Sequence, residues 1–479
     1  MKYKDLLDKY KPVLLPLLLL ASILGLALIT PGFLGLVEVL GKRIPQNNIR
    51  LDYVKGAFWA IFLGSTILFW PIRLSDKKAL MWIWLVKCLV MLGFMLFYEY
   101  YYQVDSYGYF SGARHSMSEW KAMCLASTSL PVVFITWLHQ HLFLDSFHAI
   151  KVSFGMIGLV GIYIFYRSSV IFLKQDKIIL LYVFGLFPTM LFWSSILGKE
   201  PLAFLGMAIY CCGVVAWLTM NYRYSAILAL SGIFIAVIMR PWMVFILGAP
   251  LIITIPLVLR NSVKTKIAIF LIIAFMLLFF GRQVAVNFTA KTNRGLPFFS
   301  WLLDVGNQKY NGFAQGGSAT GIKSVEMPAS TLQADALLTY SLDEINSNAA
   351  LAPKYRYKYR YRTPLDMLIY LPWGMFTVLF RPFPGEVNNF FGLLSGLEGV
   401  FLLMLFSLAV IRARWIKFAH PVILWAILLT TLWAAVYAFV GFNLGTNSRY
   451  KLQILPIFLS LLFYFYSKKT LIQPKTGEK

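Results

Sequence analysis

Long apolar runs alternate with short polar connections along this chain. Four clear runs cover residues 13–30, 178–195, 242–259 and 422–440. Each approaches the roughly 20 apolar residues that a helix needs to cross about 30 Å of hydrocarbon. The whole pattern predicts an all-α, polytopic integral membrane protein with about 12 transmembrane helices. We expect these spans at residues 13–30, 56–72, 79–98, 147–166, 178–195, 201–219, 225–239, 242–259, 267–281, 393–411, 421–441 and 452–467.

The composition supports a membrane protein. Hydrophobic residues make up 59% of the chain and charged residues 13%, whereas a soluble domain averages about 25% charged residues. An ordinary soluble globular protein is therefore excluded. Three of the four cysteines lie inside apolar runs, so neither a disulfide framework nor a thiolate metal site is expected; the four are Cys88, Cys124, Cys211 and Cys212.

The distribution of lysine and arginine predicts the orientation, because positive charge is retained on the cytoplasmic side. Four lysines precede the first span and four follow the last. Both termini are therefore predicted to be cytoplasmic, and we expect a bacterial inner (cytoplasmic) membrane. The connections assigned to the cytoplasm carry Arg73, Lys77, Lys78, Arg167, Lys174, Lys177, Arg223, Arg260, Lys264, Lys266, Arg412, Arg414 and Lys417.

This orientation requires that one apolar stretch, residues 124–144, does not cross the membrane. Pro131 and the polar residues 139–141 interrupt it, so we expect a helix lying in the interface there. The connection 31–56 fits the scheme less well, because it carries four basic residues and is nevertheless placed outside.

Three regions follow from these spans. Residues 1–281 form an N-terminal transmembrane region with an extracytoplasmic loop at 99–146. Residues 282–392 form an extracytoplasmic loop region that is richer in Gly, Ser, Asn, Ala and Asp, and its apolar stretch 365–380 is expected to be an interfacial helix. Residues 393–479 form a C-terminal transmembrane region. A loop of this length is usually functional or mobile.

Five polar motifs are predicted to emerge on the extracytoplasmic face. They contain two candidate catalytic carboxylates, one in a loop (Asp105) and one beside a lysine (Glu200), and three arginines. The motifs are QVDSYGYF with Asp105, LGKEP with Lys199 and Glu200, MRPW with Arg240, FRPFPGE with Arg381 and Glu386, and NLGTNSRYK with Arg449.

Each motif has a structural and a functional interpretation. Asp105 is either a solvated residue beyond an aromatic belt or a catalytic group, with Tyr107 and Tyr109 offering a stacking surface for a sugar. Lys199 and Glu200 are either an exposed ion pair or, before Pro201, part of an anion site at a helix N-terminus.

The arginines point to phosphate. Arg240 separates two apolar runs with almost no loop, so it either binds a substrate at membrane depth or reaches a lipid headgroup. Arginine binds phosphate with two parallel hydrogen bonds and stays charged. The alternating segment KYRYKYRYR at 354–362 is either an anchor to anionic lipids or a track for an anionic substrate. We expect membrane lipids, and no nucleic acid, among the partners.

No cofactor is required by these motifs, and a divalent metal is the one cofactor left open. His141, Asp145 and His148 share a helical face at spacings that could hold a metal. Isolated interfacial polar residues produce the same pattern often, so no metal ligand is assigned.

One carboxylate among phosphate-binding cations suits sugar transfer from a polyprenyl phosphate or pyrophosphate to a glycan or lipid-linked acceptor. The carboxylate would deprotonate the acceptor hydroxyl, and the cations would neutralise the departing phosphate.

The motif VDSYGYF in an outer loop, the many spans and the late outer loop resemble the GT-C membrane glycosyltransferases, which use polyprenyl-linked donors. That resemblance implies Asp105 as the catalytic base, although here the aspartate follows the third span instead of the first and no large C-terminal soluble domain is present.

The chain is also similar to O-antigen and exopolysaccharide polymerases or ligases. This second resemblance implies that Arg240, Arg381 and Arg449 handle a lipid pyrophosphate. A transporter or flippase of lipid-linked sugars is the alternative of another class. It would favour charges midway along spans, such as Lys87 and Glu398.

Overall fold

The chain is all-helical in the part that the structure describes, and this confirms the predicted fold class. The structure is a computed structural model, and it describes residues 3–102, 104–115, 129–220, 224–254, 267, 271–275, 278, 364–386, 390–413, 420–439 and 444–466. Its helices are α1 (Tyr3–Ile29), α2 (Phe33–Leu40), α3 (Ile49–Thr66), η1 (Ile67–Phe69), α4 (Leu74–Leu89), the π-helical η2 (Val90–Phe94), α5 (Met95–Tyr101), α6 (Asp105–His115), α8 (Leu130–Leu142), α9 (Phe147–Leu173), α10 (Ile179–Leu186), α11 (Pro188–Trp193), α12 (Lys199–Met220), α13 (Ser225–Met239), α14 (Met243–Thr254), α18 (Pro364–Phe380), α19 (Phe390–Arg412), α20 (Pro421–Ala438), α21 (Leu444–Lys451) and α22 (Leu455–Tyr466).

Seven helical stretches among these residues are long and apolar enough to cross a membrane. They are Tyr10–Ile29, Ile49–Phe69, Leu74–Tyr101, Phe147–Leu173, Lys199–Met220, Gly392–Arg412 and Pro421–Ala438. Several carry large apolar side chains on their outer surface, such as Leu26, Phe58 and Ile411. Exposing so much apolar surface to water is unfavourable, whereas contact with lipid tails is not. The chain is therefore an integral membrane protein.

The remaining predicted spans are shorter or broken. Residues 178–195 form two short helices, because Pro188 disfavours a helical conformation at Phe187, which is extended. The helices α13, α14 and α22 have 15, 12 and 12 residues. The predicted span 267–281 lies mostly outside the described residues. The total of about 12 spans therefore stays a prediction.

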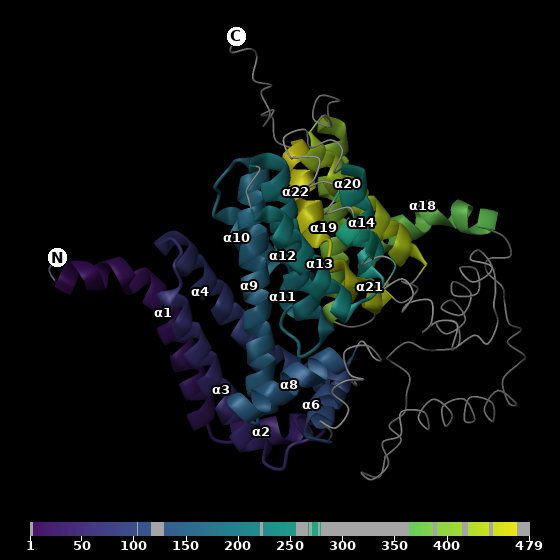
Figure 1. The fold of residues 1–479 in the computed structure, drawn as a ribbon. Helices are drawn as coiled ribbons and strands as arrows, with labels where there is room; N and C mark the ends of the chain where they lie inside the picture. The colour runs from purple at the N-terminus through teal and green to yellow at the C-terminus, as the bar shows by residue number, and fades with distance from the viewer. Residues whose placement is uncertain are drawn as a thin grey trace, which may run out of the picture.

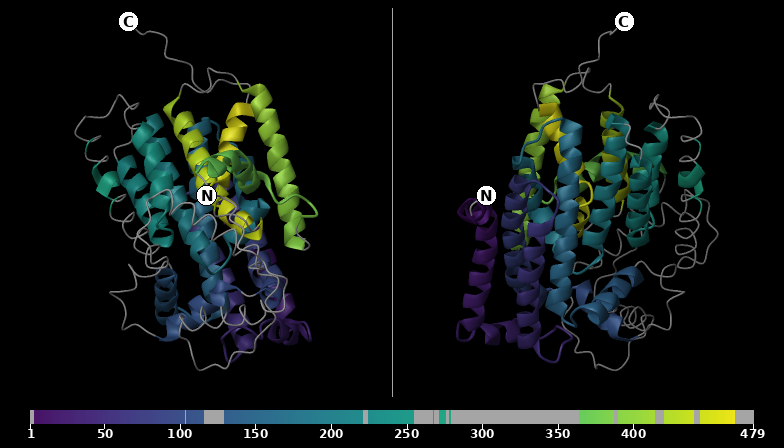
Figure 2. Two further views of the ribbon diagram at one scale, coloured as in Figure 1. Left: turned by 90° about the vertical axis from the view of Figure 1, so that its right-hand side faces the viewer. Right: turned by 60° about the vertical axis from the view of Figure 1, so that its left-hand side comes forward.

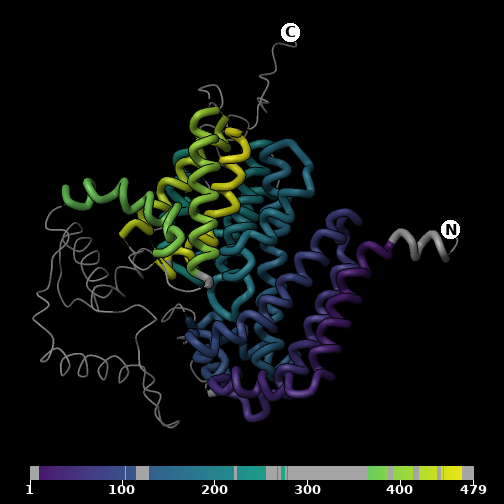
Figure 3. The backbone as a smooth tube through the Cα atoms, turned by 180° about the vertical axis from the view of Figure 1, so that it is seen from behind, coloured from purple at the N-terminus to yellow at the C-terminus, as the bar shows by residue number. Residues whose placement is uncertain are grey.

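The long helices run roughly parallel (Figure 2). Helix α9 packs against α3 on one side and α12 on the other. Helices α1, α3 and α4 lie to one side of it, and α19, α20 and α22 lie towards the other (Figures 1 and 3). Helices α12 and α13 approach closely: a Cβ atom at Gly213 would lie 2.3 Å from the Ala229 nitrogen. Small residues allow such contacts between membrane helices.

Helices α2, α6 and α8 gather at one end of the molecule (Figure 1). Helix α8 has 13 residues and is about 20 Å long, which is too short to cross a bilayer. It packs against α6 instead. This length agrees with an interfacial helix inside 124–144, although residues 124–128 lie outside the described part.

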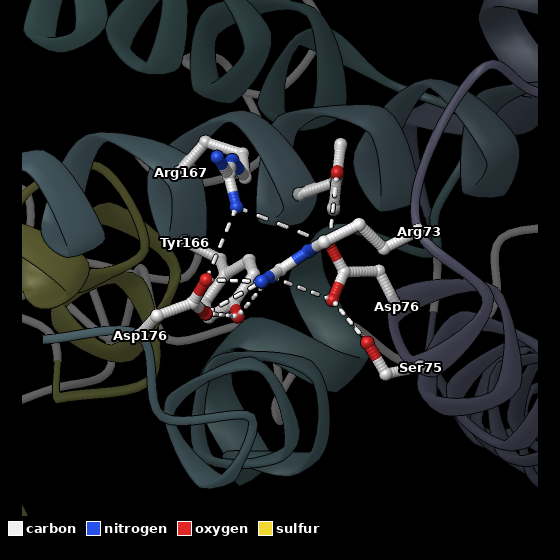
Figure 4. Close-up of polar contacts among 7 residues, drawn as sticks. Arg73, Ser75, Asp76, Tyr166, Arg167 and Asp176 are labelled. Carbon is white, nitrogen blue, oxygen red and sulfur yellow. Dashed lines mark hydrogen bonds and ion pairs between the residues drawn. The ribbon is translucent and has the colours of Figure 1, made fainter.

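A network of ion pairs closes the opposite end. Arg73, just before α4, donates hydrogen bonds to Asp76 and to Asp176, and Tyr166 also bonds Asp176 (Figure 4). Arg167 approaches both aspartates, at 4.0 and 3.9 Å. The hydrogen bond from Arg73 lowers the pKa of Asp176. This network joins the connection between α9 and α10 to the start of α4.

Candidate functional site

Side chains from four of the five polar motifs meet in one hydrogen-bonded chain. The Glu200 Oε1 atom accepts hydrogen bonds from Arg240 Nη2 at 2.7 Å and from Arg449 Nε at 2.6 Å. The Nη1 and Nη2 atoms of Arg449 each lie 3.1 Å from Asp105 Oδ2. The order is therefore Arg240, Glu200, Arg449, Asp105, and we call these four residues the Glu200 network.

Each member of the network stands at the end of a helix. Glu200 lies in the first turn of α12, and Asp105 begins α6. Arg240 follows the last residue of α13, where its extended backbone and Pro241 end the helix. Arg449 lies in the last turn of α21. Helix ends fix these side chains more firmly than an open loop would.

Burial is greatest at Glu200 and Arg240 and decreases through Arg449 to Asp105. The side chain of Glu200 is 1% exposed and that of Arg240 is 6% exposed, whereas Arg449 is 25% and Asp105 59% exposed. Burying a charge is costly unless it is paired. Glu200 provides one negative charge for two guanidinium groups, so the three inner residues keep a net positive charge next to an exposed carboxylate.

Aromatic rings flank both arginines. The Cζ atom of Arg240 lies 4.5 Å from the centre of the Tyr450 ring, and that of Arg449 lies 5.7 Å from the Trp193 ring. Such contacts stabilise a guanidinium and hold its plane. Sequence reasoning missed both rings. Tyr450 could have been found because it adjoins Arg449, whereas nothing in the sequence connects Trp193 with this site.

Lys199 adds a further cation beside the network. It is the first residue of α12, is half-buried, and interacts electrostatically with Arg240, Glu200 and Asp105. The N-terminus of α12, with its partial positive charge, lies at the same place. Glu200 is buried and is the counter-ion of Arg240 and Arg449, so it does not form an exposed ion pair in a turn.

Arg381 and Glu386 form a pair of their own outside the network. Arg381 donates from Nε at 2.9 Å and from Nη2 at 2.6 Å to Glu386 Oε1. This bonding lowers the pKa of Glu386. The turn between them has a positive φ of 91° at Gly385, which glycine adopts readily. Lys451 bonds the Arg381 carbonyl oxygen at 3.2 Å, so the turn contacts α21 two residues beyond Arg449.

The two tyrosines after Asp105 are packed within the protein. Tyr109 is 7% exposed and belongs to a core cluster with Phe110. Burial raises the pKa of Tyr109 to about 12. The half-buried Tyr107 ring lies 5.4 Å from that of Phe147, and its hydroxyl contacts the Glu99 carbonyl oxygen. Both rings thus support α6 and offer little open face for stacking.

Two buried polar pairs near α6 were not anticipated. Lys151 bonds Glu99 at 2.9 Å, and His148 Nδ1 lies 2.5 Å from Asp52 Oδ2; all four residues are at most 5% exposed. A single charge inside an apolar run is visible in the sequence, but its partner on another helix is not. These pairs join α9 to α3 and to α5.

The triad His141, Asp145 and His148 does not form a metal site. Asp145 pairs with Arg114, and His148 faces Asp52. No group of three or more His, Cys, Asp or Glu side chains in the described part of the chain could hold a metal ion. The basic segment 354–362 lies outside the described residues.

Lys87 and Glu398 bind the two ends of the short helix α11. Lys87 Nζ donates to Ser194 Oγ at 2.6 Å and to Ser195 Oγ at 2.7 Å. Glu398 Oε2 accepts from the Thr189 backbone nitrogen at 2.8 Å. A carboxylate at the start and an ammonium at the end suit the helix dipole. These mid-span charges therefore hold α11, which carries Trp193 to Arg449.

Comparisons of the chain with protein-family models, with curated proteins and with solved structures find no match.

Proposed function

We propose that this protein is a membrane glycosyltransferase that uses a polyprenyl-phosphate-linked sugar at the extracytoplasmic face, in the assembly of a surface polysaccharide or glycoconjugate. The Glu200 network carries the proposal. It combines two arginines, fixed by one buried carboxylate, with an exposed aspartate within bonding distance of the outer arginine.

The network provides the two charges that sugar transfer needs. The acceptor hydroxyl must lose a proton, and the exposed Asp105 can receive it. The phosphate must leave as an anion, and Arg240, Arg449 and Lys199 can neutralise its charge. Glu200 is 1% exposed and already accepts two hydrogen bonds, so we assign it to holding the arginines instead of to proton transfer.

The proposed reaction displaces the polyprenyl phosphate from the anomeric carbon of the donor sugar. The acceptor oxygen forms a bond to the anomeric carbon of the donor sugar, while its proton moves to Asp105. The bond between the anomeric carbon and the phosphate oxygen breaks, and the electron pair leaves with the polyprenyl phosphate. The arginines gain most in this step because the departing phosphate bears more negative charge than the donor.

The orientation is part of the proposal. We place the end with α2, α6 and α8 outside and the end with Arg73 and Arg167 in the cytoplasm, which agrees with the positions of lysine and arginine in short connections. A bacterial inner membrane, about 12 spans and cytoplasmic termini belong to the same proposal.

The test is a transfer assay in proteoliposomes with a polyprenyl-phosphate-linked sugar and a lipid-linked acceptor. Asp105→Asn should abolish product while expression and folding stay normal, because Asp105 is 59% exposed. Asp145→Asn is the matched control, since Asp145 is 51% exposed and also pairs with an arginine. Full transfer by Asp105→Asn would contradict the assignment of the base.

A polymerase or ligase acting on polyprenyl-pyrophosphate-linked glycans is the second candidate, and the same arginine pair favours it. It differs in its donor and in its need for Asp105. Product formation from a pyrophosphate-linked glycan, retained in Asp105→Asn and lost in Arg449→Gln, would favour this candidate.

A transporter is supported less well. Its main sequence argument is the pair of mid-span charges. In the structure Lys87 bonds the serines that follow α11, and Glu398 bonds the Thr189 backbone at its start. Movement of lipid-linked sugar across proteoliposomes without any product would favour transport.

A further inference from the structure

The guanidinium group of Arg449 hydrogen-bonds two carboxylates that differ strongly in burial. Its Nε atom donates to Glu200, which is 1% exposed, at 2.6 Å. Its two terminal nitrogens both donate to one oxygen of Asp105, which is 59% exposed, at 3.1 Å. The inner contact is part of the buried protein, and the outer contact faces solvent.

The two contacts should therefore differ in strength. A buried, charge-assisted hydrogen bond is costly to break, because it leaves an unpaired charge in the interior. An exposed ion pair contributes little and exchanges readily. The terminal nitrogens of Arg449 form the fork with which arginine binds a phosphate group. In the structure this fork is occupied by Asp105.

We propose that the Asp105 carboxylate takes the place of the donor phosphate on Arg449, and that donor binding displaces it. The phosphate then receives the two terminal N–H groups of Arg449, while Glu200 keeps the Nε contact and the orientation of the side chain. The displaced Asp105 has both oxygens available for the acceptor hydroxyl. Donor binding thus frees Asp105 to act as the base. Without the donor, Asp105 stays hydrogen-bonded to Arg449. This inference rests on the proposed function, because it assigns the contact a role in donor binding.

Competition between Asp105 and phosphate has a measurable consequence. If the carboxylate must leave Arg449 before phosphate binds, removing its charge should strengthen phosphate binding although it abolishes transfer. The small free energy of an exposed ion pair corresponds to about a twofold to fivefold lower Kd. A base with no contact to the phosphate site would not change the Kd in this direction.

The probe is farnesyl phosphate, titrated by calorimetry into the full-length protein in detergent, with farnesol as the uncharged control. Asp105→Asn should bind farnesyl phosphate about twofold to fivefold more tightly than the wild type, with farnesol binding unchanged. Asp145→Asn should leave both affinities unchanged, because its partner is Arg114.

A double-mutant cycle separates competition for Arg449 from a general loss of negative charge. Arg449→Lys keeps a cation near Glu200 but lacks the fork, so adding Asp105→Asn to it should give no further gain. A gain of the same size in both backgrounds overturns the proposal, as does an unchanged or weaker affinity in Asp105→Asn.

Failure of this inference can be told apart from failure of the proposed function. If the wild type binds farnesyl phosphate and Asp105→Asn binds it no better, only the displacement is wrong. If the wild type does not bind it above farnesol, the phosphate site itself is refuted, and the displacement with it.

Discussion

Glu200 is the member of the network whose loss should reveal most about it. Glu200→Gln keeps an oxygen acceptor of nearly the same shape but removes the buried negative charge that bonds both Arg240 and Arg449. Two charge-assisted hydrogen bonds, at 2.7 and 2.6 Å, become neutral-acceptor bonds. Each is worth about 1.5–3 kcal/mol, and removing one partner of a buried pair costs about 3–5 kcal/mol.

We expect a loss near the lower end of that range, about 3 kcal/mol, because Arg449 keeps its contact to Asp105. For a chain of this length the unfolding entropy converts such a loss into a fall in Tm of roughly 3 °C. The two uncompensated arginines should also attract an anion more strongly. Farnesyl phosphate should therefore raise the Tm of Glu200→Gln by more than it raises that of the wild type.

Glu99→Gln is the matched control for this experiment. Glu99 is also buried and pairs with Lys151 at 2.9 Å, so its loss should lower the Tm by a similar amount. It lies outside the network, and farnesyl phosphate should stabilise this variant only as much as the wild type. An unchanged Tm in Glu200→Gln, or an equal response to the ligand in both variants, would refute the reasoning.

Three further predictions concern residues around the network and at the opposite end. Lys87→Met should lower the free energy of unfolding by about 2–4 kcal/mol, since it removes the side chain that bonds the end of α11. Thermal unfolding measures this loss, and lost transport at unchanged stability would contradict it. Arg381→Gln should retain most of the transfer activity because Glu386 engages its guanidinium, whereas an oxyanion-binding arginine typically contributes about 100-fold or more; initial rates decide between them. The lowered pKa of Asp176 predicts a stabilising contribution that is present above the ordinary value of 3.8 and is lost as the pH falls through the lower folded value. Asp176→Asn should therefore lower the Tm slightly at pH 7 and by less at pH 3, and an equal difference at both pH values would argue against the pair with Arg73.

The sequence predicted the class of fold because hydrophobic runs record burial in lipid directly. It was less reliable where a run is interrupted without a change in hydropathy. Residues 178–195 are apolar throughout, yet Pro188 divides them into α10 and α11. Pro456 similarly stands at the start of α22, so the predicted span 452–467 contains only a short helix in the described part. Hydropathy measures the apolar character of a segment, whereas the local backbone decides its continuity.

The candidate site was predicted in part for a similar reason. The predicted topology places Asp105, Glu200, Arg240 and Arg449 on one face of the membrane. In the structure hydrogen bonds join these four residues. The pattern could not indicate that Arg381 would turn towards Glu386, because both are charged residues in the same short motif. Pairing between distant helices depends on side-chain geometry that one sequence does not record.

The buried pairs near α6 show the same limit. Glu99 stands within an aromatic run and Lys151 within an apolar helix, so each could be recognised as unusual, but their contact joins residues 52 positions apart. The sequence likewise suggests a transport role for Lys87 and Glu398, whereas in the structure both bond the ends of α11.

The most direct test of the central claim is a cryo-electron microscopy structure of the protein in lipid nanodiscs with a polyprenyl phosphate. We predict phosphate density between Arg240 and Arg449, with Glu200 still bonded to both and Asp105 turned away from Arg449. Density for the phosphate at the opposite end of the molecule, beside Arg73 and Arg167, would contradict it.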